Sequence, residues 1–154
     1  WIRKCRWSNQ WLKRSIKMSL LTTKGVYGLM AIIEISKGDR TNPVSLKDIS
    51  LVTNISKNYL EQLLNNLRKN GIVSSIKGIK GGYYLSKALD EITLFDIFNS
   101  LENEFNLVST ELRNSPYGAF FDEYDKKLKE LFTQPLSSIK IDSEQAGKYL
   151  NYVI

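Results

Sequence analysis

One stretch decides the fold of this chain: Ser56-Lys57-Asn58-Tyr59-Leu60-Glu61-Gln62-Leu63-Leu64-Asn65-Asn66-Leu67-Arg68-Lys69-Asn70-Gly71. Its leucines recur at spacings of three and four residues, the period of a helix with one buried face. Ser56 is a typical amino-terminal cap, and Gly71 suits the left-handed position after the last turn. Arg68 and Lys69 favour the carboxyl end of the helix dipole. The sequence therefore predicts an amphipathic helix over residues 56–71.

The face of this helix opposite the leucines is polar over its first turns. It carries hydrogen-bond donors, acceptors and one aromatic ring, on Lys57, Asn58, Tyr59, Glu61, Gln62 and Asn65. Such side chains can read base edges in a DNA major groove. An ordinary solvated face is the commoner explanation when the helix is taken alone. The neighbouring segments decide between the two.

Two further helices are predicted before this stretch. Residues 22–36 form an apolar helix in which Gly25 and Gly28 permit close approach of another backbone. Residues 45–52 form a short helix, and residues 53–55 form a tight turn. Two helices joined by such a turn, the second with a polar leading face, are typical of a helix-turn-helix.

A β-hairpin is predicted after the stretch. Two β-rich runs, residues 72–77 and 83–86, flank the turn Gly78-Ile79-Lys80-Gly81-Gly82. One interpretation is a plain hairpin with solvating lysines. The other is a wing, whose glycines let the backbone approach a sugar–phosphate chain that Lys77 and Lys80 neutralise. Helix, helix-turn-helix and wing together favour DNA binding.

The remaining apolar periodicity predicts two more helices. Residues 89–101 have Thr93 as a candidate cap. Residues 117–133 carry an apolar seam that little following chain can cover, made of Tyr117, Phe120, Phe121, Tyr124, Leu128, Leu131 and Phe132. The simplest way to bury this seam is to pack it against a second copy of the chain. The alternative is that it packs on the chain's own core. The apolar ending, residues 149–154, is expected to dock.

Charge divides the chain of 154 residues into three segments. Residues 1–17 hold six basic residues and no acid, together with all three tryptophans. They are either a leader foreign to the native protein or a basic arm for phosphates or a membrane surface. Residues 18–88 hold ten basic and four acidic residues, as expected of a DNA-binding domain. Residues 89–154 hold six basic and twelve acidic residues, and we expect a dimerisation and effector region there.

Several classes of protein are excluded by what the sequence lacks. There is no histidine, and Cys5 is the only cysteine, so no Cys/His metal site and no histidine-based catalysis can be assembled. Any redox role of Cys5 is left open. No apolar run approaches the roughly 20 residues of a membrane span. We therefore predict a cytoplasmic protein that is not an enzyme, has no metal or cofactor and does not bind membranes.

Five motifs follow one another between residue 18 and about residue 101. They are Thr22-Thr23-Lys24-Gly25-x-Tyr27-Gly28-Leu29, Val44-Ser45-Leu46-Lys47-Asp48-Ile49, Ile55-Ser56-x-x-Tyr59-Leu60-Glu61-Gln62-Leu63-Leu64, Leu67-Arg68-Lys69-x-Gly71-Ile72-Val73 and Lys77-Gly78-x-Lys80-Gly81-Gly82-Tyr83-x-Leu85. In this order and spacing they resemble the Rrf2 family of bacterial winged-helix transcription regulators. The resemblance implies a mainly α fold with a small β-wing, that is, a winged helix-turn-helix domain plus a long dimerisation helix.

The resemblance also implies a homodimer, held by residues 117–133, on a palindromic operator in double-stranded DNA. Base and groove contacts would come from Ser56, Tyr59, Glu61 and Gln62. Lys77 matches a basic wing residue that enters the minor groove. Lys24 matches a basic position near the DNA backbone. The complete predicted DNA-binding set is Lys24, Lys47, Ser56, Lys57, Asn58, Tyr59, Glu61, Gln62, Lys77, Lys80, Gly81 and Gly82.

Cluster-binding members of the family carry three cysteines in the loop that matches residues 102–116, where this chain has none. The chain thus resembles the cluster-free branch, whose best-known member represses cysteine metabolism. We expect a repressor that responds to an effector metabolite or a partner enzyme. The alternative is a protein-interaction module on a winged-helix scaffold that signals through a partner enzyme.

Overall fold

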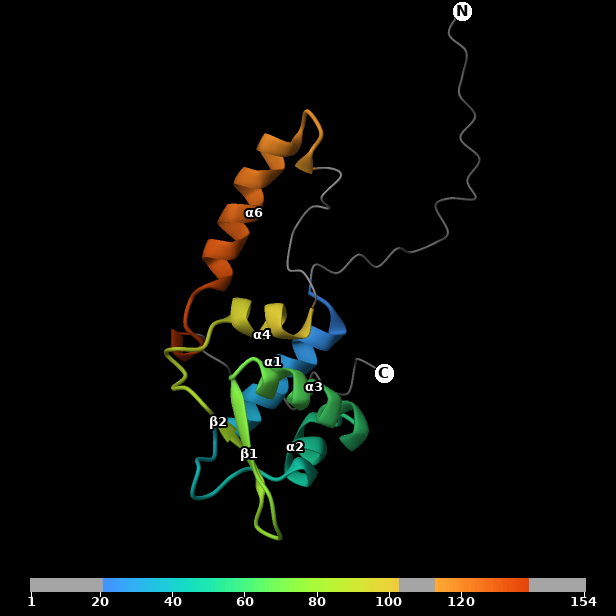
Figure 1. The fold of residues 1–154 in the computed structure, drawn as a ribbon, viewed down its shortest axis with the longest axis vertical. Coiled ribbons are helices and arrows are strands. Elements are labelled where there is room, and N and C mark those ends of the chain that lie inside the picture. Colours follow the sequence, from blue (N-terminus) through green and yellow to red (C-terminus); the bar gives the residue numbers. More distant parts are fainter. Residues whose placement is uncertain (1–20, 103–112, 139–154) are drawn as a thin grey trace, which may run out of the picture.

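The computed structural model describes residues 21–102 and 113–138 (Figure 1). Its elements in chain order are α1 (Thr23–Ile35), α2 (Leu46–Thr53), α3 (Lys57–Lys69), β1 (Val73–Ile76), β2 (Gly82–Leu85), α4 (Leu94–Leu101), α6 (Gly118–Phe132) and the 3-10 turn η2 (Leu136–Ser138). This confirms the predicted mainly α fold with a small β-wing. The predicted leader at 1–17 and the apolar ending at 149–154 lie outside the described residues. In the described ranges, no helix combines the length and the apolar character that a membrane crossing requires.

Side-chain caps set the bounds of α2 and α3 as predicted, to within a residue or two. The Ser56 hydroxyl accepts the Tyr59 N–H at 3.4 Å, so α3 begins at the next residue after Ser56. Gly71 has a φ of +70°, the left-handed conformation expected after the last turn. The turn between α2 and α3 is made by Asn54, which is also left-handed at φ 54°.

The helix predicted over residues 89–101 begins later, at Leu94. Thr93 and Asp96 form a reciprocal capping box, in which the Thr93 Oγ1 accepts the Asp96 N–H at 3.1 Å and the Asp96 Oδ2 accepts the Thr93 N–H at 2.9 Å. The cap holds Thr93 in an extended conformation, which ends any helix that would precede it. The carbonyl of Ile92 instead accepts the Leu136 N–H at 2.8 Å.

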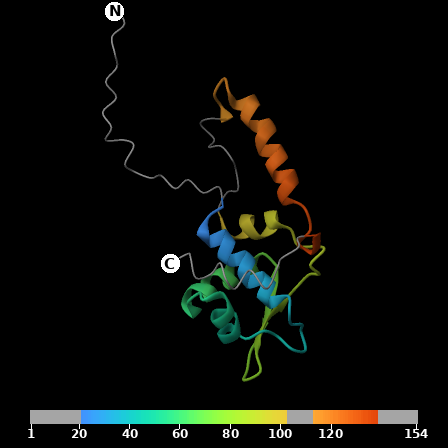
Figure 2. The same cartoon turned by 180° about the vertical axis from the view of Figure 1, so that it is seen from behind.

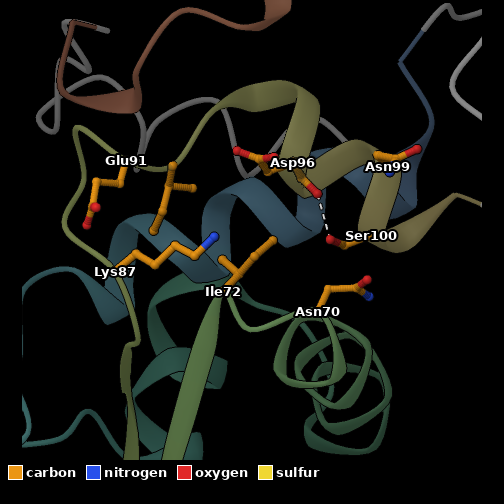
Figure 3. Close-up of a pocket in the computed structure, with 8 residues that line it drawn as sticks. Asn70, Ile72, Lys87, Glu91, Asp96, Asn99 and Ser100 are labelled. Atoms are coloured by element: carbon orange, nitrogen blue, oxygen red, sulfur yellow. Dashed lines mark hydrogen bonds between the residues drawn. The ribbon is translucent and has the colours of Figure 1, made fainter.

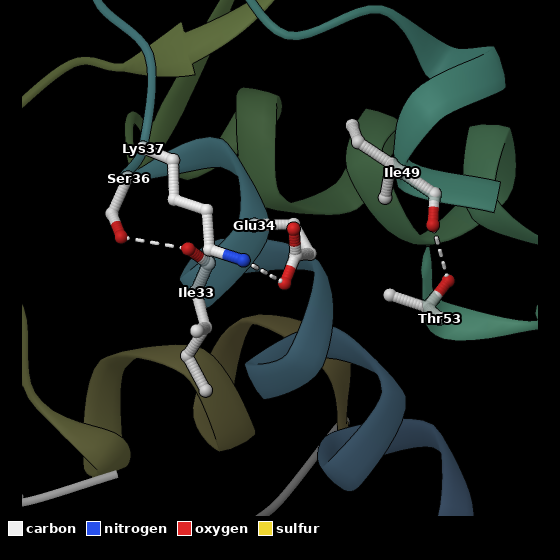
Figure 4. A network of polar contacts seen from close by, with 6 residues as sticks. All are labelled: Ile33, Glu34, Ser36, Lys37, Ile49 and Thr53. Atoms are coloured by element: carbon white, nitrogen blue, oxygen red, sulfur yellow. Dashed lines mark hydrogen bonds and ion pairs between the residues drawn. The ribbon is translucent and has the colours of Figure 1, made fainter. Parts of the chain in front are cut away.

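Polar side chains close the carboxyl ends of α1 and α2 (Figure 4). The Ser36 Oγ donates to the Ile33 carbonyl at 2.7 Å, and the Thr53 Oγ1 donates to the Ile49 carbonyl at 2.6 Å. Thr53 was predicted in the turn, but this bond and its burial place it in the last turn of α2. These contacts satisfy polar groups in the final turns of both helices.

The hydrophobic core lies where α1, α3 and α4 meet. Its members have exposed fractions of a few per cent or less, and those from the three helices are Ala31, Ile32, Ile35, Leu60, Leu63, Leu64, Leu67, Ile97, Phe98 and Leu101. α1 crosses α4 closely: a Cβ built on Gly25 would lie 2.1 Å from the Phe98 ring, and one built on Gly28 would lie 2.1 Å from a Leu101 methyl. The two glycines make room for side chains of α4, whereas the prediction was close approach of another backbone. The core runs across the predicted division at residue 88.

β1 and β2 form an antiparallel hairpin in which Val73 pairs with Leu85 and Ile76 pairs with Gly82. Val44 extends this sheet, since its N–H and carbonyl are bonded to the Tyr83 carbonyl and N–H at 2.9 and 2.8 Å. Figures 1 and 2 show the tip of the hairpin at one end of the molecule and α6 at the other.

We expect Gly25→Ala to lower the free energy of unfolding by about 1–3 kcal/mol, because the new methyl group enters the space of the packed Phe98 ring. Gly28→Ala is the matched control, since its methyl group meets the end of a flexible leucine side chain and should cost less. Urea denaturation of both variants measures the difference. An unchanged midpoint for Gly25→Ala would contradict the tight helix crossing.

Candidate nucleic-acid interface

The predicted DNA-contacting side chains are mostly exposed, and they lie on α2, on the amino-terminal half of α3 and at the hairpin tip. The exposed members are Lys47, Ser56, Lys57, Asn58, Glu61, Gln62, Lys77 and Lys80. Those on α3 project outward because the opposite face of that helix holds its four buried leucines. With four lysines and one carboxylate, the surface is suited to a polyanion.

Arg68 connects α3 to the wing. Its guanidinium group donates to the Ser75 Oγ at 3.2 Å and to the Asn65 Oδ1 at 3.0 Å. In the sequence Arg68 was assigned only to the helix dipole, because pairing with a strand residue seven positions away has no local signal. The bonds hold the hairpin beside the helix, so that the two present one surface.

Electrostatics also places Glu61 near the wing. Burial, and then the negative charge of Glu61, raise the pKa of Tyr83 above its ordinary value, while the positive charge of Arg68 lowers that pKa. The Glu61 carboxylate thus lies near enough to the Tyr83 phenol for its charge to act on that pKa. Its carboxylate partly offsets the positive charge of the surface.

Two residues that were predicted to contact DNA make contacts within the chain. The Tyr59 ring is half-buried and packs edge-on against Tyr27, with ring centres 6.1 Å apart, so it also fixes α3 on α1. The Lys24 ammonium group donates to the carbonyl of Leu101. Lys24 thus holds the carboxyl end of α4, and a contact with DNA requires this bond to be exchanged.

The two wing glycines have a role within the fold, beside the predicted approach to a sugar–phosphate chain. A Cβ on Gly82 would lie 2.4 Å from the Val44 carbonyl oxygen, and one on Gly81 would lie 2.3 Å from the Ile76 carbonyl oxygen. Any larger residue would push the hairpin away from its neighbour or open its turn. The packing of the hairpin thus requires both glycines, and their approach to DNA stays a prediction.

A second surface of interest is the apolar seam of α6. Tyr117, Phe120, Tyr124 and Leu131 are 70%, 59%, 49% and 59% exposed. The Phe120 ring lies 5.3 and 4.8 Å from the rings of Phe121 and Tyr124, so part of the seam is one aromatic cluster. Figure 1 shows most of α6 standing away from the other labelled helices, and among the described residues this cluster stays largely exposed.

The other side of α6 is held by its own chain, and two residues there differ from prediction. Phe132, predicted in the dimer seam, is 8% exposed because its ring packs against Phe98 at 5.8 Å. Asp125, assigned to the solvated face, is buried and receives ion pairs from Arg113 at 3.2 Å and Lys129 at 2.9 Å. Phe132 therefore has little surface left for a partner.

A polar hollow of about 130 Å³ lies between the carboxyl end of α3 and α4 (Figure 3). Its two carboxylates hold the backbone: Glu91 accepts the Ala88 N–H at 3.1 Å, and Asp96 caps α4. The hollow is separate from the amino-terminal turns of α3. Within residues 21–102 and 113–138, no group of three or more His, Cys, Asp or Glu side chains is placed to hold a metal ion.

Comparison with known proteins identifies this arrangement. The sequence model of the Rrf2 family, described as an iron-dependent transcriptional regulator, matches residues 21–141. The HTH-type transcriptional regulator CymR of Bacillus subtilis is 46% identical over 88 residues, which are 57% of this chain and 64% of that protein. The regulator IscR of Klebsiella pneumoniae is 43% identical over 82 residues, 53% of this chain and 50% of that protein. The chain thus matches between half and two thirds of the length of these relatives.

Solved structures agree with the sequence matches. CymR of B. subtilis, described as the global cysteine regulator, superposes with a TM-score of 0.68 at 36% identity, covering 78% of this chain and 95% of that one. IscR of T. potens superposes with a TM-score of 0.64 at 31% identity, covering 79% and 85%. Both superpositions cover more than three quarters of this chain.

We expect Glu61→Gln to lower the pKa of Tyr83 and Arg68→Ala to raise it, because each change removes one charge that acts on the phenol. NMR titration of ring-labelled tyrosine measures both shifts, and Tyr83→Phe identifies the resonance. The raised pKa means that the folded state favours the neutral phenol. Its contribution to stability is therefore complete below the ordinary pKa and is lost as the pH rises through the folded-state value. Identical titrations in all variants would contradict the placement of Glu61 beside the wing.

Proposed function

Because this chain belongs to the Rrf2 family of transcriptional regulators, we propose that it is a dimeric repressor that binds DNA in a sequence-specific way and works without an iron–sulfur cluster. One observation carries the proposal. The exposed polar side chains of α3 and the lysine-bearing wing form one surface, joined through Arg68. Regulators of this family bind DNA and act as dimers.

Affinity comes from contacts with phosphates. Lys47, Lys57, Lys77 and Lys80 are exposed and can each neutralise a phosphate, which releases counterions and makes binding dependent on salt. Such contacts position the protein without distinguishing one sequence from another. Lys24 can contact a phosphate only after its hydrogen bond to the Leu101 carbonyl is broken.

Sequence selectivity comes from the amino-terminal half of α3. Gln62 can form paired hydrogen bonds with adenine, and Glu61 can accept from the amino group of cytosine. Ser56 and Asn58 are exposed beside them and add polar contacts. Glu61 also repels phosphate, so it disfavours wrong sites as much as it favours right ones.

The α6 seam is the proposed dimer interface, formed by Tyr117, Phe120, Phe121, Tyr124, Leu128 and Leu131. The four most exposed of these side chains lie away from their own chain's core. Burial of each would contribute roughly 1.5–3 kcal/mol. A symmetric pair of α6 helices buries the same surface on both copies, which matches two winged helices to a palindromic operator.

The residues of this chain do not fit an iron–sulfur cluster, although the family is described as iron-dependent. Such clusters are held by several thiolates, and this sequence contains one cysteine, Cys5, and no histidine. The proposed signal is therefore an effector metabolite or a partner enzyme. The likeness to a protein called the global cysteine regulator makes cysteine metabolism the first place to search.

Operators selected from randomised DNA test the proposal when they are combined with two variants. Gln62→Ala should cost about 1–3 kcal/mol at one base position of each half-site, because it removes a direct contact with a base. Lys77→Ala should weaken binding to every sequence and lower the salt slope by about one unit, because it removes one phosphate contact. Fluorescence anisotropy at several salt concentrations separates the two effects.

Each variant is the control for the other. An unchanged salt slope in Lys77→Ala would exclude its phosphate contact, and an equal loss over all operator variants in Gln62→Ala would exclude direct readout. If the wild-type chain selects no DNA, the proposal is wrong and the protein-interaction module takes its place.

We expect Phe120→Glu to convert the dimer to a monomer, because it places a charge in the middle of the exposed aromatic cluster. Lys126→Glu is the matched control, as this residue is exposed on the polar part of the same helix. Sedimentation velocity gives the oligomeric state of both. Dimers that survive Phe120→Glu would place the interface elsewhere.

A further inference from the structure

The turn of the wing ends in an apolar side chain that the described residues leave uncovered. Ile79 is 108% exposed, the highest value among the large apolar side chains of residues 21–102 and 113–138. Exposed Lys77 and Lys80 lie on either side of it in the turn. An exposed isoleucine between two lysines, at the tip of the hairpin, is suited to a ligand that is a polyanion outside and apolar inside.

The turn is narrow and its shape is determined by its own bonds. The Gly81 N–H donates to the Gly78 carbonyl at 3.0 Å, and Gly78 has a φ of +120° that favours glycine. These two glycines add no side chain next to Ile79. A β-branched residue has few rotamers, so Ile79 loses little conformational freedom when it is buried. The tip of the hairpin is therefore narrow, and its apolar side chain has little conformational freedom.

The base of the hairpin is held in position relative to α3. Val44 is bonded to Tyr83 on one strand, and Arg68 is bonded to Ser75 on the other. The tip projects beyond the rest of the fold (Figures 1 and 2). With the amino-terminal half of α3 in a major groove, the projecting tip of the hairpin would face the adjacent minor groove. That groove is about 6 Å wide and admits only a thin element.

We infer that Ile79 is an apolar wedge that enters the DNA minor groove and partly opens one base step. The inference rests on the proposed function and adds a residue and a mode of recognition to it. Isoleucine is one of the side chains that unstack base steps and kink a duplex in this way. Lys77 and Lys80 would neutralise the phosphates on either side, so the charge pattern and the apolar tip match one ligand.

The wedge has a consequence for operator choice. Opening a step is easiest at flexible pyrimidine–purine steps, so the wing would favour such a step without any hydrogen bond to a base. Selectivity would then have two independent sources. One is direct readout by α3, and the other is the deformability of the DNA under the wing.

The experiment compares the wild-type chain with Ile79→Ala, Ile79→Met and Lys80→Ala on an operator selected from randomised DNA. The readouts are the affinity, its salt slope, the DNA bend from energy transfer between end labels, and the fluorescence of 2-aminopurine placed in turn at each step of the operator. Ile79 is exposed, so its replacement leaves the fold intact, and thermal melting of each variant checks this.

Ile79→Ala should weaken binding by roughly tenfold, reduce the bend and abolish the 2-aminopurine signal, while the salt slope stays unchanged because no charge is lost. Ile79→Met should restore the bend, since methionine also serves as a wedge. Lys80→Ala should show the opposite pattern, with a salt slope lower by about one unit and an intact bend.

A wild-type complex with straight DNA, or an equal bend with Ile79→Ala, overturns the wedge and leaves the proposed function standing. A loss of affinity in Ile79→Ala without any change in bend or 2-aminopurine signal overturns it as well. A wild-type chain that binds no selected DNA overturns both the wedge and the proposed function.

Discussion

Burial of the leucine face of α3 is the constraint on which the rest of the structure depends. Leu60, Leu63, Leu64 and Leu67 are at most 1% exposed, and they pack between α1 and α4. A helix with one face fixed in a core has only its opposite face available to a ligand. The outward placement of Glu61 and Gln62 is therefore a consequence of hydrophobic packing.

The two ends of the molecule serve separate purposes. The wing and the amino-terminal half of α3 form a basic, exposed surface, and α6 carries an aromatic one at the opposite end. α4 joins them, since it packs on α1 through Gly25 and receives Phe132 of α6 against Phe98. A continuous packed path of α6, α4 and α1 thus connects the two surfaces.

Much of the fold was predictable because its signals are local. Ser56 and Thr93 stop or start helices through bonds to residues three positions away, and the leucine period defines the buried face of α3. Predictions failed where local pattern and tertiary packing disagree. Residues 89–93 were included in the predicted helix, but Thr93 caps it and the Ile92 carbonyl binds Leu136 instead. Asp125 looked solvated but is buried in an ion-pair network, and Phe132 looked free but packs against its own chain.

The sequence by itself determined the winged helix, the polar face of α3 and the lack of a Cys/His set for a metal cluster, because these follow from periodicity, capping residues and composition. Only the tertiary structure decided which of these side chains remain available. In the folded chain, Lys24 is bonded at the end of α4 and Tyr59 packs on Tyr27. Arg68 is bonded to the wing, and Ile79 stays exposed at its tip. The physical reason is that such contacts join residues distant along the chain, and no local pattern records which distant groups the fold brings together.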